Sequence, residues 1–240
     1  MTTSAAVIVF DLDDTLYLER DFAASGYRAV GQWMAERFGI TDFADRAARV
    51  FATGDRARIF DSVLAELGLA DAPPIAMLVE LYRNHFPTIA LAPDAAAYLD
   101  RHCDQRMALL TDGHAPTQMN KVRALGLADR GMAPIVCTGE WGRRFWKPHH
   151  RGFEHIAAHP GHAGCTLVYV ADNCAKDFIA PRAMGWRTVQ IRREGAIHAF
   201  AANSGQQADA VIVSLDELDA VLDALAREPD ARLQANSGRG

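Results

Sequence analysis

Three absences limit what this chain can be. No run of apolar residues approaches the length of about 18 that a membrane-spanning helix needs. No tract of Lys and Arg offers the positive surface with which proteins neutralise nucleic-acid phosphates. The N-terminal segment also lacks the basic stretch that opens a signal peptide. We therefore expect neither a membrane nor a nucleic-acid partner, and a cytoplasmic location.

Cysteine is scarce, and its spacing forms no motif. Cys103, Cys137, Cys165 and Cys174 contain no CxxC pair, and they are expected to be reduced and mostly buried thiols. The chain has 240 residues, of which 50% are hydrophobic and 23% charged, with a formal net charge of −5. This composition is typical of a globular protein with one large domain, or one domain that carries an insertion.

The most informative stretch begins at Val7. Four consecutive apolar residues predict a fully buried strand, and Asp11 and Asp13 follow it almost at once. Strand ends are where open α/β sheets bind their ligands. Because several carboxylates are costly to bury together without a cation, this strand end predicts a site for a divalent metal and for a substrate that the metal helps to hold.

From residue 92 onward, short apolar segments alternate with helical patterns. This alternation predicts an α/β fold with a doubly wound parallel sheet and helices on both faces. The further strands are expected near residues 107–111, 134–138, 166–170, 187–191 and 209–213.

Residues 17–88 differ from the rest, because they show helical periodicity and no strand pattern. They are expected to form an all-helical domain inserted after the first strand. The predicted core domain therefore comprises residues 1–16 and 89–228, and residues 229–240 are expected to form a flexible tail.

Reactive side chains follow several of the predicted strands. Since the carboxyl ends of parallel strands share one edge of the sheet, these side chains are expected to converge. Besides the two aspartates of the first strand, the set comprises Thr111, Asp112, Gly113, Lys147, Asp172 and Asp177.

In this order the residues resemble the motifs of the haloacid dehalogenase superfamily. The resemblance runs from about Val7 to Val213 and is to the magnesium-dependent phosphatases that carry a helical cap after the first strand. The residues similar to the four motifs are, in turn, Asp11-x-Asp13-x-Thr15, then Thr111, then Lys147, then Asp172 with Asp177.

The resemblance implies a role for each residue of the reaction. Asp11 would be the nucleophile that forms an aspartyl-phosphate, and Asp13 would protonate the leaving oxygen and then activate water. Thr111, with the backbone amides around Asp112 and Gly113, would bind the phosphoryl oxygens. A lysine, Lys147, would also bind them, neutralise the developing charge and steady the nucleophile.

The resemblance also implies a Mg²⁺ cofactor. Asp11, the backbone carbonyl of Asp13 and the carboxylate of Asp172 would bind the ion, and Asp177 would support it through water or Lys147. Magnesium suits a site built of oxygen ligands. A count of the charges around Mg²⁺ and Lys147 leaves negative charge in excess, so we predict that Asp13 is neutral when substrate binds.

The expected function is a phosphatase of a small phosphorylated metabolite, either a sugar phosphate or a nucleoside monophosphate. The alternatives are a phosphomutase or a haloacid dehalogenase of the same superfamily, or a binding module without turnover. Asp13 and Asp172 disfavour the dehalogenase. The protein is expected to be a monomer or a homodimer.

Three details stay open in the sequence. The basic and aromatic stretch 141–147 either contributes to substrate recognition or packs Trp146 beneath its loop. The Asp112 side chain is expected to face solvent. Candidates for contact with substrate near the start of the insertion are Tyr17, Glu19, Arg20 and Asp21, and those deeper in it are Tyr27, Arg56, Arg58, Tyr82 and His85.

Overall fold

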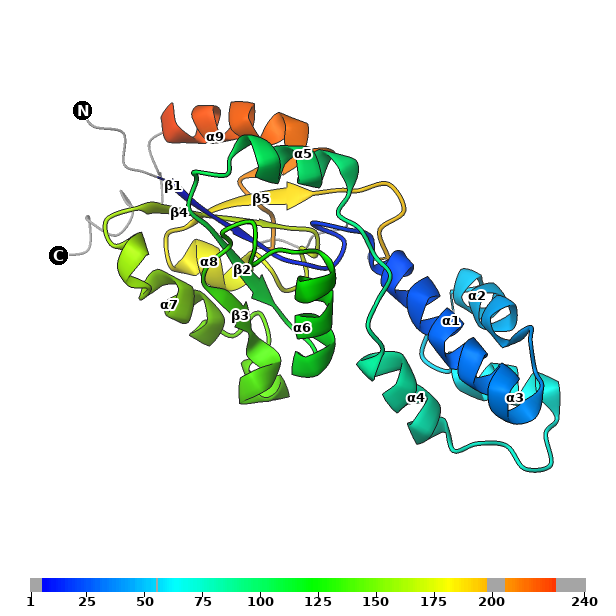
Figure 1. Cartoon of the computed structure of the whole chain (residues 1–240). Helices are drawn as coiled ribbons and strands as arrows, with labels where there is room; N and C mark the ends of the chain where they lie inside the picture. Colours follow the sequence, from blue (N-terminus) through cyan, green and yellow to red (C-terminus); the bar gives the residue numbers. More distant parts are fainter. Residues whose placement is uncertain (1–5, 55, 198–205, 228–240) are drawn as a thin grey trace.

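The described residues form a parallel sheet with helices on both faces, and a group of four further helices stands beside it (Figure 1). The structure, a computed structural model, describes residues 6–54, 56–197 and 206–227. Six strands lie in the order β3-β2-β1-β4-β5-β6, and every neighbouring pair is parallel. The strands are β1 Ala6–Phe10, β2 Met107–Thr111, β3 Ile135–Cys137, β4 Thr166–Ala171, β5 Arg187–Ile191 and β6 Ala210–Ile212.

Strand β1 is central, and its side chains alternate between two hydrophobic cores. Ile8 and Phe10 pack on the face that α5, α6 and α9 cover, whereas Val7 and Val9 pack on the face of α7 and α8. All four side chains are fully buried, which explains the uninterrupted apolar run. These helices are α5 Pro93–Arg101, α6 Ala115–Ala124, α7 Arg151–Ala157, α8 Ile179–Ala183 and α9 Leu218–Arg227.

The doubly wound α/β fold predicted from the sequence is confirmed. The strands fall within a residue or two of their predicted positions, with one instructive difference at β3. This strand begins at Ile135 rather than at Pro134, because proline has no N–H to donate to a neighbouring strand.

Residues 19–84 form the four helices that stand beside the sheet, here called the four-helix unit (Figure 1). The unit has its own hydrophobic core, centred on Val30, Met34 and Leu78. The predicted helical insertion is therefore present, although the sequence did not single out α2. The predicted domain limits, 1–16 with 89–228 and 17–88, stay predictions. The helices are α1 Glu19–Phe38, α2 Phe43–Ala52, α3 Ile59–Leu67 and α4 Ile75–Asn84.

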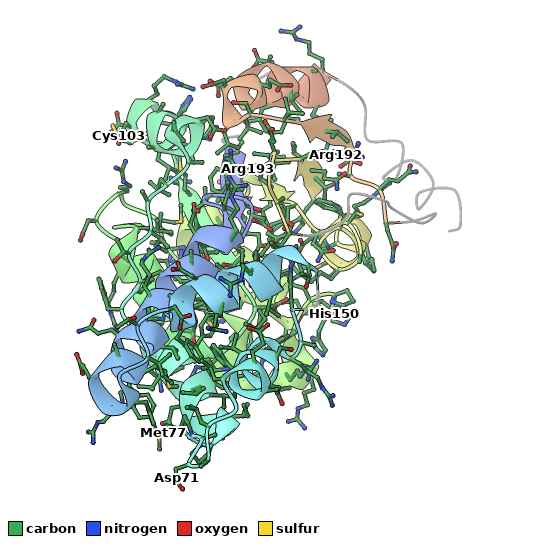
Figure 2. All side chains as sticks on the ribbon, turned by 90° about the vertical axis from the view of Figure 1, so that its right-hand side faces the viewer. Asp71, Met77, Cys103, His150, Arg192 and Arg193 are labelled. Atoms are coloured by element: carbon green, nitrogen blue, oxygen red, sulfur yellow. The ribbon has the colours of Figure 1, made fainter. Side chains whose placement is uncertain are left out.

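Helix α6 of the sheet domain binds the end of α4. The Thr117 hydroxyl donates to the carbonyl of Arg83 at 2.8 Å, and the Asn120 amide donates to the carbonyls of Asn84 and His85, each at 3.3 Å. These carbonyls end a helix and have no partner within it. The contact therefore fixes the four-helix unit against the C-terminal edge of the sheet. Figure 2 shows its far end, at Asp71 and Met77, well away from the opposite end of the molecule at Cys103.

Two further predictions concern the chain as a whole. Among the residues that the structure describes, no helix is both long enough and apolar enough to cross a membrane. All four cysteines are free thiols; Cys137 and Cys174 are buried, whereas Cys165 is half-buried and Cys103 is exposed. The predicted tail, 229–240, lies outside the described residues.

Candidate active site

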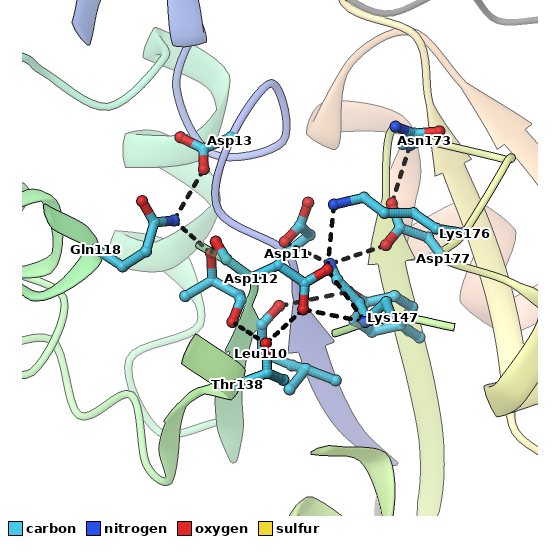
Figure 3. Close-up of polar contacts among 12 residues, drawn as sticks. Asp11, Asp13, Leu110, Asp112, Gln118, Thr138, Lys147, Asn173, Lys176 and Asp177 are labelled. Atoms are coloured by element: carbon cyan, nitrogen blue, oxygen red, sulfur yellow. Dashed lines mark hydrogen bonds and ion pairs between the residues drawn. The ribbon is translucent and has the colours of Figure 1, made fainter. Parts of the chain in front are cut away.

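The sheet brings the predicted strand-end residues together. Phe10 of β1 is level with Leu109 of β2 and with Val170 of β4. The three strands therefore end side by side, and the residues that follow them meet at one edge. Figure 3 shows this edge, where Asp11 follows β1, Asp112 follows β2, and Asn173 and Asp177 come after β4.

Lys147 lies at the centre of the site and is buried. Its Nζ is 2.8 Å from Asp11 Oδ1, 2.8 Å from Asp177 Oδ1 and 2.8 Å from the Tyr169 hydroxyl. Burial alone would lower the pKa of this lysine, but the two carboxylates outweigh it and raise the pKa well above the ordinary value. Lys147 is therefore held as a cation against the carboxylate that the sequence singles out as nucleophile.

Three aspartates form a buried acidic cluster. Carboxylate oxygens of Asp11, Asp172 and Asp177 all lie within 4.8 Å of one another. Burial, together with the other two carboxylates, raises the pKa of Asp172 to about 9. Burial also raises the pKa of Asp11 to about 6, although Lys147 opposes it. Within the described part of the chain, the buried Asp172 Oδ2 has no hydrogen-bond partner.

These observations fit a divalent cation. Carboxylates whose pKa values rise because they crowd one another are stabilised as anions when a positive charge enters among them. The donor atoms are all oxygen, which suits Mg²⁺. The buried Asp172 Oδ2, which lacks a hydrogen-bond partner among the described residues, would gain one as a ligand of such an ion.

Asp13 points away from this cluster, towards helix α6 and the start of the four-helix unit (Figure 3). Its carboxylate is 2.6 Å from Lys121 Nζ, accepts a bond of 2.9 Å from the Gln118 amide and accepts another from the Tyr17 hydroxyl. Burial alone would raise its pKa, but the charge of Lys121 and these bonds lower it. In this state Asp13 is a carboxylate. Its predicted neutrality applies to the substrate complex and stays a prediction.

Gln118 and Lys121 are site residues that the sequence did not reveal. Both are buried on α6, one turn apart. Gln118 also donates to Thr111 Oγ1 at 2.6 Å, so it joins Asp13 to the predicted phosphate ligand. The sequence did contain one signal for them. Two polar residues occupy the buried face of α6, where helical periodicity predicts apolar side chains.

The expected solvent exposure of Asp112 is wrong. Its carboxylate is buried and accepts bonds from the Thr138 hydroxyl at 2.6 Å and from the Lys147 backbone N–H at 3.1 Å. Lys176 Nζ lies 3.3 Å from it. Asp112 therefore ties the loop after β2 to the segment that carries Lys147, which is a structural task that the motif pattern does not reveal.

The loop after β2 fits closely against a 3-10 helix, η1 Thr138–Trp141. Gly113 adopts a φ of 127°, a conformation that favours glycine. A Cβ at Gly139 would stand 1.8 Å from the Gly113 carbonyl oxygen. Glycine at position 139 is therefore required for the predicted phosphate-binding backbone to keep its place.

A cavity of about 570 Å³ opens between the acidic cluster and the four-helix unit. The sheet domain contributes Asp11, Asp13, Asp172 and the loop after β2. The four-helix unit contributes Glu19, a candidate from the sequence, whereas Tyr17 reaches the site through Asp13. The remaining wall is formed by Phe22, Tyr82, Arg83, His114, Ala115, Thr117, Gln118, Lys121, Gly139, Arg143, Trp146 and Lys176.

Comparison with known proteins gives three results. Residues 5–185 match the family of haloacid dehalogenase-like hydrolases. A glyceraldehyde 3-phosphate phosphatase of Methanopyrus kandleri is 27% identical over 198 residues, which are 78% of this chain and 83% of that protein. Solved structures of similar fold include both putative hydrolases and dehalogenases.

Two of these structures illustrate the range. A HAD-hydrolase of Bacillus subtilis, YfnB, bound to magnesium, is 20% identical with a TM-score of 0.63. A 2-haloacid dehalogenase of Pseudomonas syringae is 22% identical with a TM-score of 0.61. Each alignment covers 92% of this chain and 99% of the other. At these identities the likeness concerns the fold.

Proposed function

The chain belongs to the haloacid dehalogenase-like hydrolase family, and from that membership we propose that it is a Mg²⁺-dependent phosphatase of a small phosphomonoester. The observation that carries the proposal is the buried cluster of Asp11, Asp172 and Asp177, whose carboxylates need a cation. Displacement of a halide from carbon by a carboxylate does not itself require a metal cation. The phosphatase activity of the relative from Methanopyrus kandleri supports the same choice.

In the first step, Asp11 attacks phosphorus. An oxygen of its carboxylate forms a bond to phosphorus, the bond from phosphorus to the leaving oxygen breaks, and an aspartyl-phosphate results. Lys147, 2.8 Å from Asp11 Oδ1, orients the nucleophile and offsets negative charge on the phosphoryl oxygens.

Asp13 handles the protons of both steps. In its neutral form it gives a proton to the departing alcohol; as a carboxylate it then takes one from the water that attacks the aspartyl-phosphate. That attack releases inorganic phosphate and restores Asp11. The contacts with Gln118 and Lys121 fix the direction in which Asp13 points.

The phosphoryl oxygens bind the loop after β2. The Thr111 hydroxyl and the backbone N–H groups around Asp112 and Gly113 are the proposed donors. The buried carboxylate of Asp112 and the close approach of Gly139 hold this loop in place before substrate arrives. Donors that are fixed in advance need no reorganisation during the reaction.

Mg²⁺ would be held by Asp11, Asp172 and the backbone carbonyl of Asp13, with Asp177 in support. When bound, the ion supplies positive charge to the phosphoryl group and neutralises the buried carboxylates. Asp177 belongs to the acidic cluster and also touches Lys147, so it acts on both charges of the site.

The test is phosphate release from a panel of sugar phosphates and nucleoside monophosphates, with and without Mg²⁺. Asp11→Asn is the active-site variant. Asp71→Asn is a matched control, because Asp71 is exposed at the far end of the four-helix unit. We expect release that requires Mg²⁺, vanishes in Asp11→Asn and persists in Asp71→Asn.

Three other outcomes would overturn the proposal. Isomerised sugar phosphate without free phosphate would show a phosphomutase. Halide release from a 2-haloacid without Mg²⁺ would show a dehalogenase. Binding of phosphate esters without any product would show a module that lacks turnover.

A further inference from the structure

Two arginines in the wall of the cavity have no carboxylate within ion-pair distance among the described residues. The lysines and arginines that line the cavity are Arg83, Lys121, Arg143 and Lys176. The two lysines are occupied, one by Asp13 at 2.6 Å and the other by Asp112 at 3.3 Å. Arg83 and Arg143 form no such pair and are exposed to the cavity and to solvent.

The two arginines line the same cavity as the loop that is proposed to bind phosphate. Arg83 lies at the end of α4, where its carbonyl accepts the bond from Thr117 of α6, the helix that follows the loop. Arg143 lies in a 3-10 helix, η2 Arg143–Phe145, directly after the segment whose Gly139 touches Gly113. A ligand held by the loop would therefore lie in a cavity that both arginines line.

The aromatic ring of Trp146 positions the Arg143 side chain. Its guanidinium carbon lies 5.5 Å from the centre of the Trp146 ring, and both residues line the cavity. Contact with an aromatic face restrains a guanidinium and leaves its N–H groups free to bind an anion. Of the two alternatives that the sequence left open for the stretch 141–147, this placement favours substrate recognition.

We propose that the leaving alcohol of the substrate carries a second anionic group, a carboxylate or a second phosphate, which Arg83 and Arg143 bind. The inference rests on the proposed phosphatase function and narrows its substrate class. Guanidinium groups bind carboxylate and phosphate through paired N–H donors. A cavity of about 570 Å³ has room for such a group beside the phosphoryl group.

The four-helix unit also adds an acid, Glu19, to the cavity, where it interacts electrostatically with Asp13 and Lys121. Glu19 begins α1, and its backbone N–H donates to Asp14 at 2.8 Å, in the connection that also carries Asp13. The arginines instead come from the end of α4 and from η2. The two arginines therefore add positive charge to the cavity that the loop after β2 also lines.

The test compares two substrates that differ in one group. 3-Phosphoglycerate carries a carboxylate where glycerol 3-phosphate carries a hydroxymethyl group. Fructose 1,6-bisphosphate against fructose 6-phosphate tests a second phosphate in the same way. For each pair we define a ratio: kcat/KM of the substrate with the second anionic group divided by kcat/KM of the substrate without it. The ratio is measured in wild type, Arg83→Ala, Arg143→Ala and Arg143→Lys.

Arg144→Ala and Arg123→Ala are the controls. Arg144 adjoins Arg143 in sequence but stacks on Phe145, at 4.7 Å from the ring centre, and does not line the cavity. Arg123 is exposed on α6 and donates to Asn120. Both controls are expected to keep the wild-type ratio.

We expect a wild-type ratio of at least about 10 for one of the pairs, a fall of about tenfold in the ratio for each alanine variant, and partial recovery in Arg143→Lys. The pair with the higher ratio identifies the second group as carboxylate or phosphate. Phosphate release with ratios near one in both pairs would overturn the inference alone. Equal loss on both members of a pair would also overturn it, because that shows a structural role. No release from any substrate would overturn the proposed function, and the inference with it.

Discussion

Lys121 Nζ lies 2.6 Å from Asp13 Oδ1, and the side chain of this lysine is 4% exposed. The ammonium group also stands 4.2 Å from the centre of the Phe22 ring. A buried charge of this kind is stable only because its partner is close. The proposed acid and base of the reaction is therefore positioned by a helix of the sheet domain and by a ring of the four-helix unit together.

Replacing Lys121 by methionine should impair proton transfer more than phosphoryl transfer. Without the lysine, Asp13 loses its ion pair and one of the three contacts that fix its direction. We expect kcat/KM for glycerol 3-phosphate to fall about 10- to 100-fold. The loss for p-nitrophenyl phosphate should be smaller, because its leaving group departs without a proton. Arg123→Met, on the exposed face of the same helix, is the control, and equal loss on both substrates would contradict the prediction.

Gly139→Ala should damage the phosphate-binding loop. The added Cβ would meet the Gly113 carbonyl at 1.8 Å, so the loop after β2 must move. A misplaced loop loses transition-state donors, and we expect kcat/KM to fall at least about tenfold. Gly161→Ala is the control, since its Cβ would meet only the His159 side chain, at 3.3 Å. Steady-state kinetics of both variants checks this, and unchanged activity in Gly139→Ala would rule it out.

Removal of metal should make stability depend on pH. In the metal-free protein the pKa values are raised to about 6 for Asp11 and about 9 for Asp172. A carboxyl whose pKa is raised on folding stabilises the fold below its unfolded value of about 4, and this contribution is lost as pH rises through the folded value. The Tm of the metal-free protein should therefore fall between about pH 5 and about pH 9.

Magnesium should oppose that fall. The ion binds the ionised cluster, so the rise in Tm that it causes should be larger at about pH 8 than at about pH 5. Asp172→Asn should reduce both the rise and the pH dependence of the metal-free Tm. Thermal unfolding of the two proteins with EDTA or Mg²⁺ checks this. An equal rise at both pH values would speak against the cluster as the metal site.

Asp94→Asn should destabilise the fold at neutral pH. Arg193 (Figure 2) binds both oxygens of Asp94, at 2.8 and 3.0 Å, and also donates to the Thr15 carbonyl at 2.7 Å. Burial alone would raise the pKa of Asp94, but the bonds from Arg193 and from the Leu215 N–H lower it. We expect the free energy of unfolding to fall by about 1–3 kcal/mol near neutral pH.

The same variant should matter less in acid. A carboxyl whose pKa is lowered on folding stabilises the fold above its unfolded pKa, and that contribution disappears as pH falls through the folded value. The difference between wild type and Asp94→Asn should thus shrink below about pH 4. Denaturant titrations at both pH values measure it, with the exposed Asp223→Asn as control. A difference that is independent of pH would contradict the charge of Asp94 as its cause.

Strand positions and strand-end residues could be predicted because each is a local pattern. An apolar run that stops at a carboxylate, as before Asp11, encodes both a buried strand and the place where it ends. If neighbouring strands are parallel, their carboxyl ends lie at one edge of the sheet. That edge therefore brings together Asp11, Thr111 and Asp172. Lys147 follows from its place after the third strand and from the resemblance.

The rest of the site depends on packing between segments that are distant in sequence. In the sequence, Gln118 and Lys121 look like ordinary polar residues of a helix. Only their contacts with Asp13 in the structure show that they hold this carboxylate in place. In the sequence, Asp112 looks like an exposed loop residue. Only its contacts with Thr138 and Lys147 in the structure show that it is buried. Cavity residues such as Arg143 depend in the same way on how the sheet domain and the four-helix unit together line the cavity.

Helix α6 contacts two parts of the molecule at once. It clamps Asp13 through Gln118 and Lys121, and through Thr117 and Asn120 it binds the last carbonyls of α4. Any separation of the four-helix unit from the sheet must break the α4 contacts, at a cost of about 1 kcal/mol for each hydrogen bond. If substrate entered by such a separation, the same helix that releases α4 would also carry the two side chains that hold the proposed proton donor, Asp13.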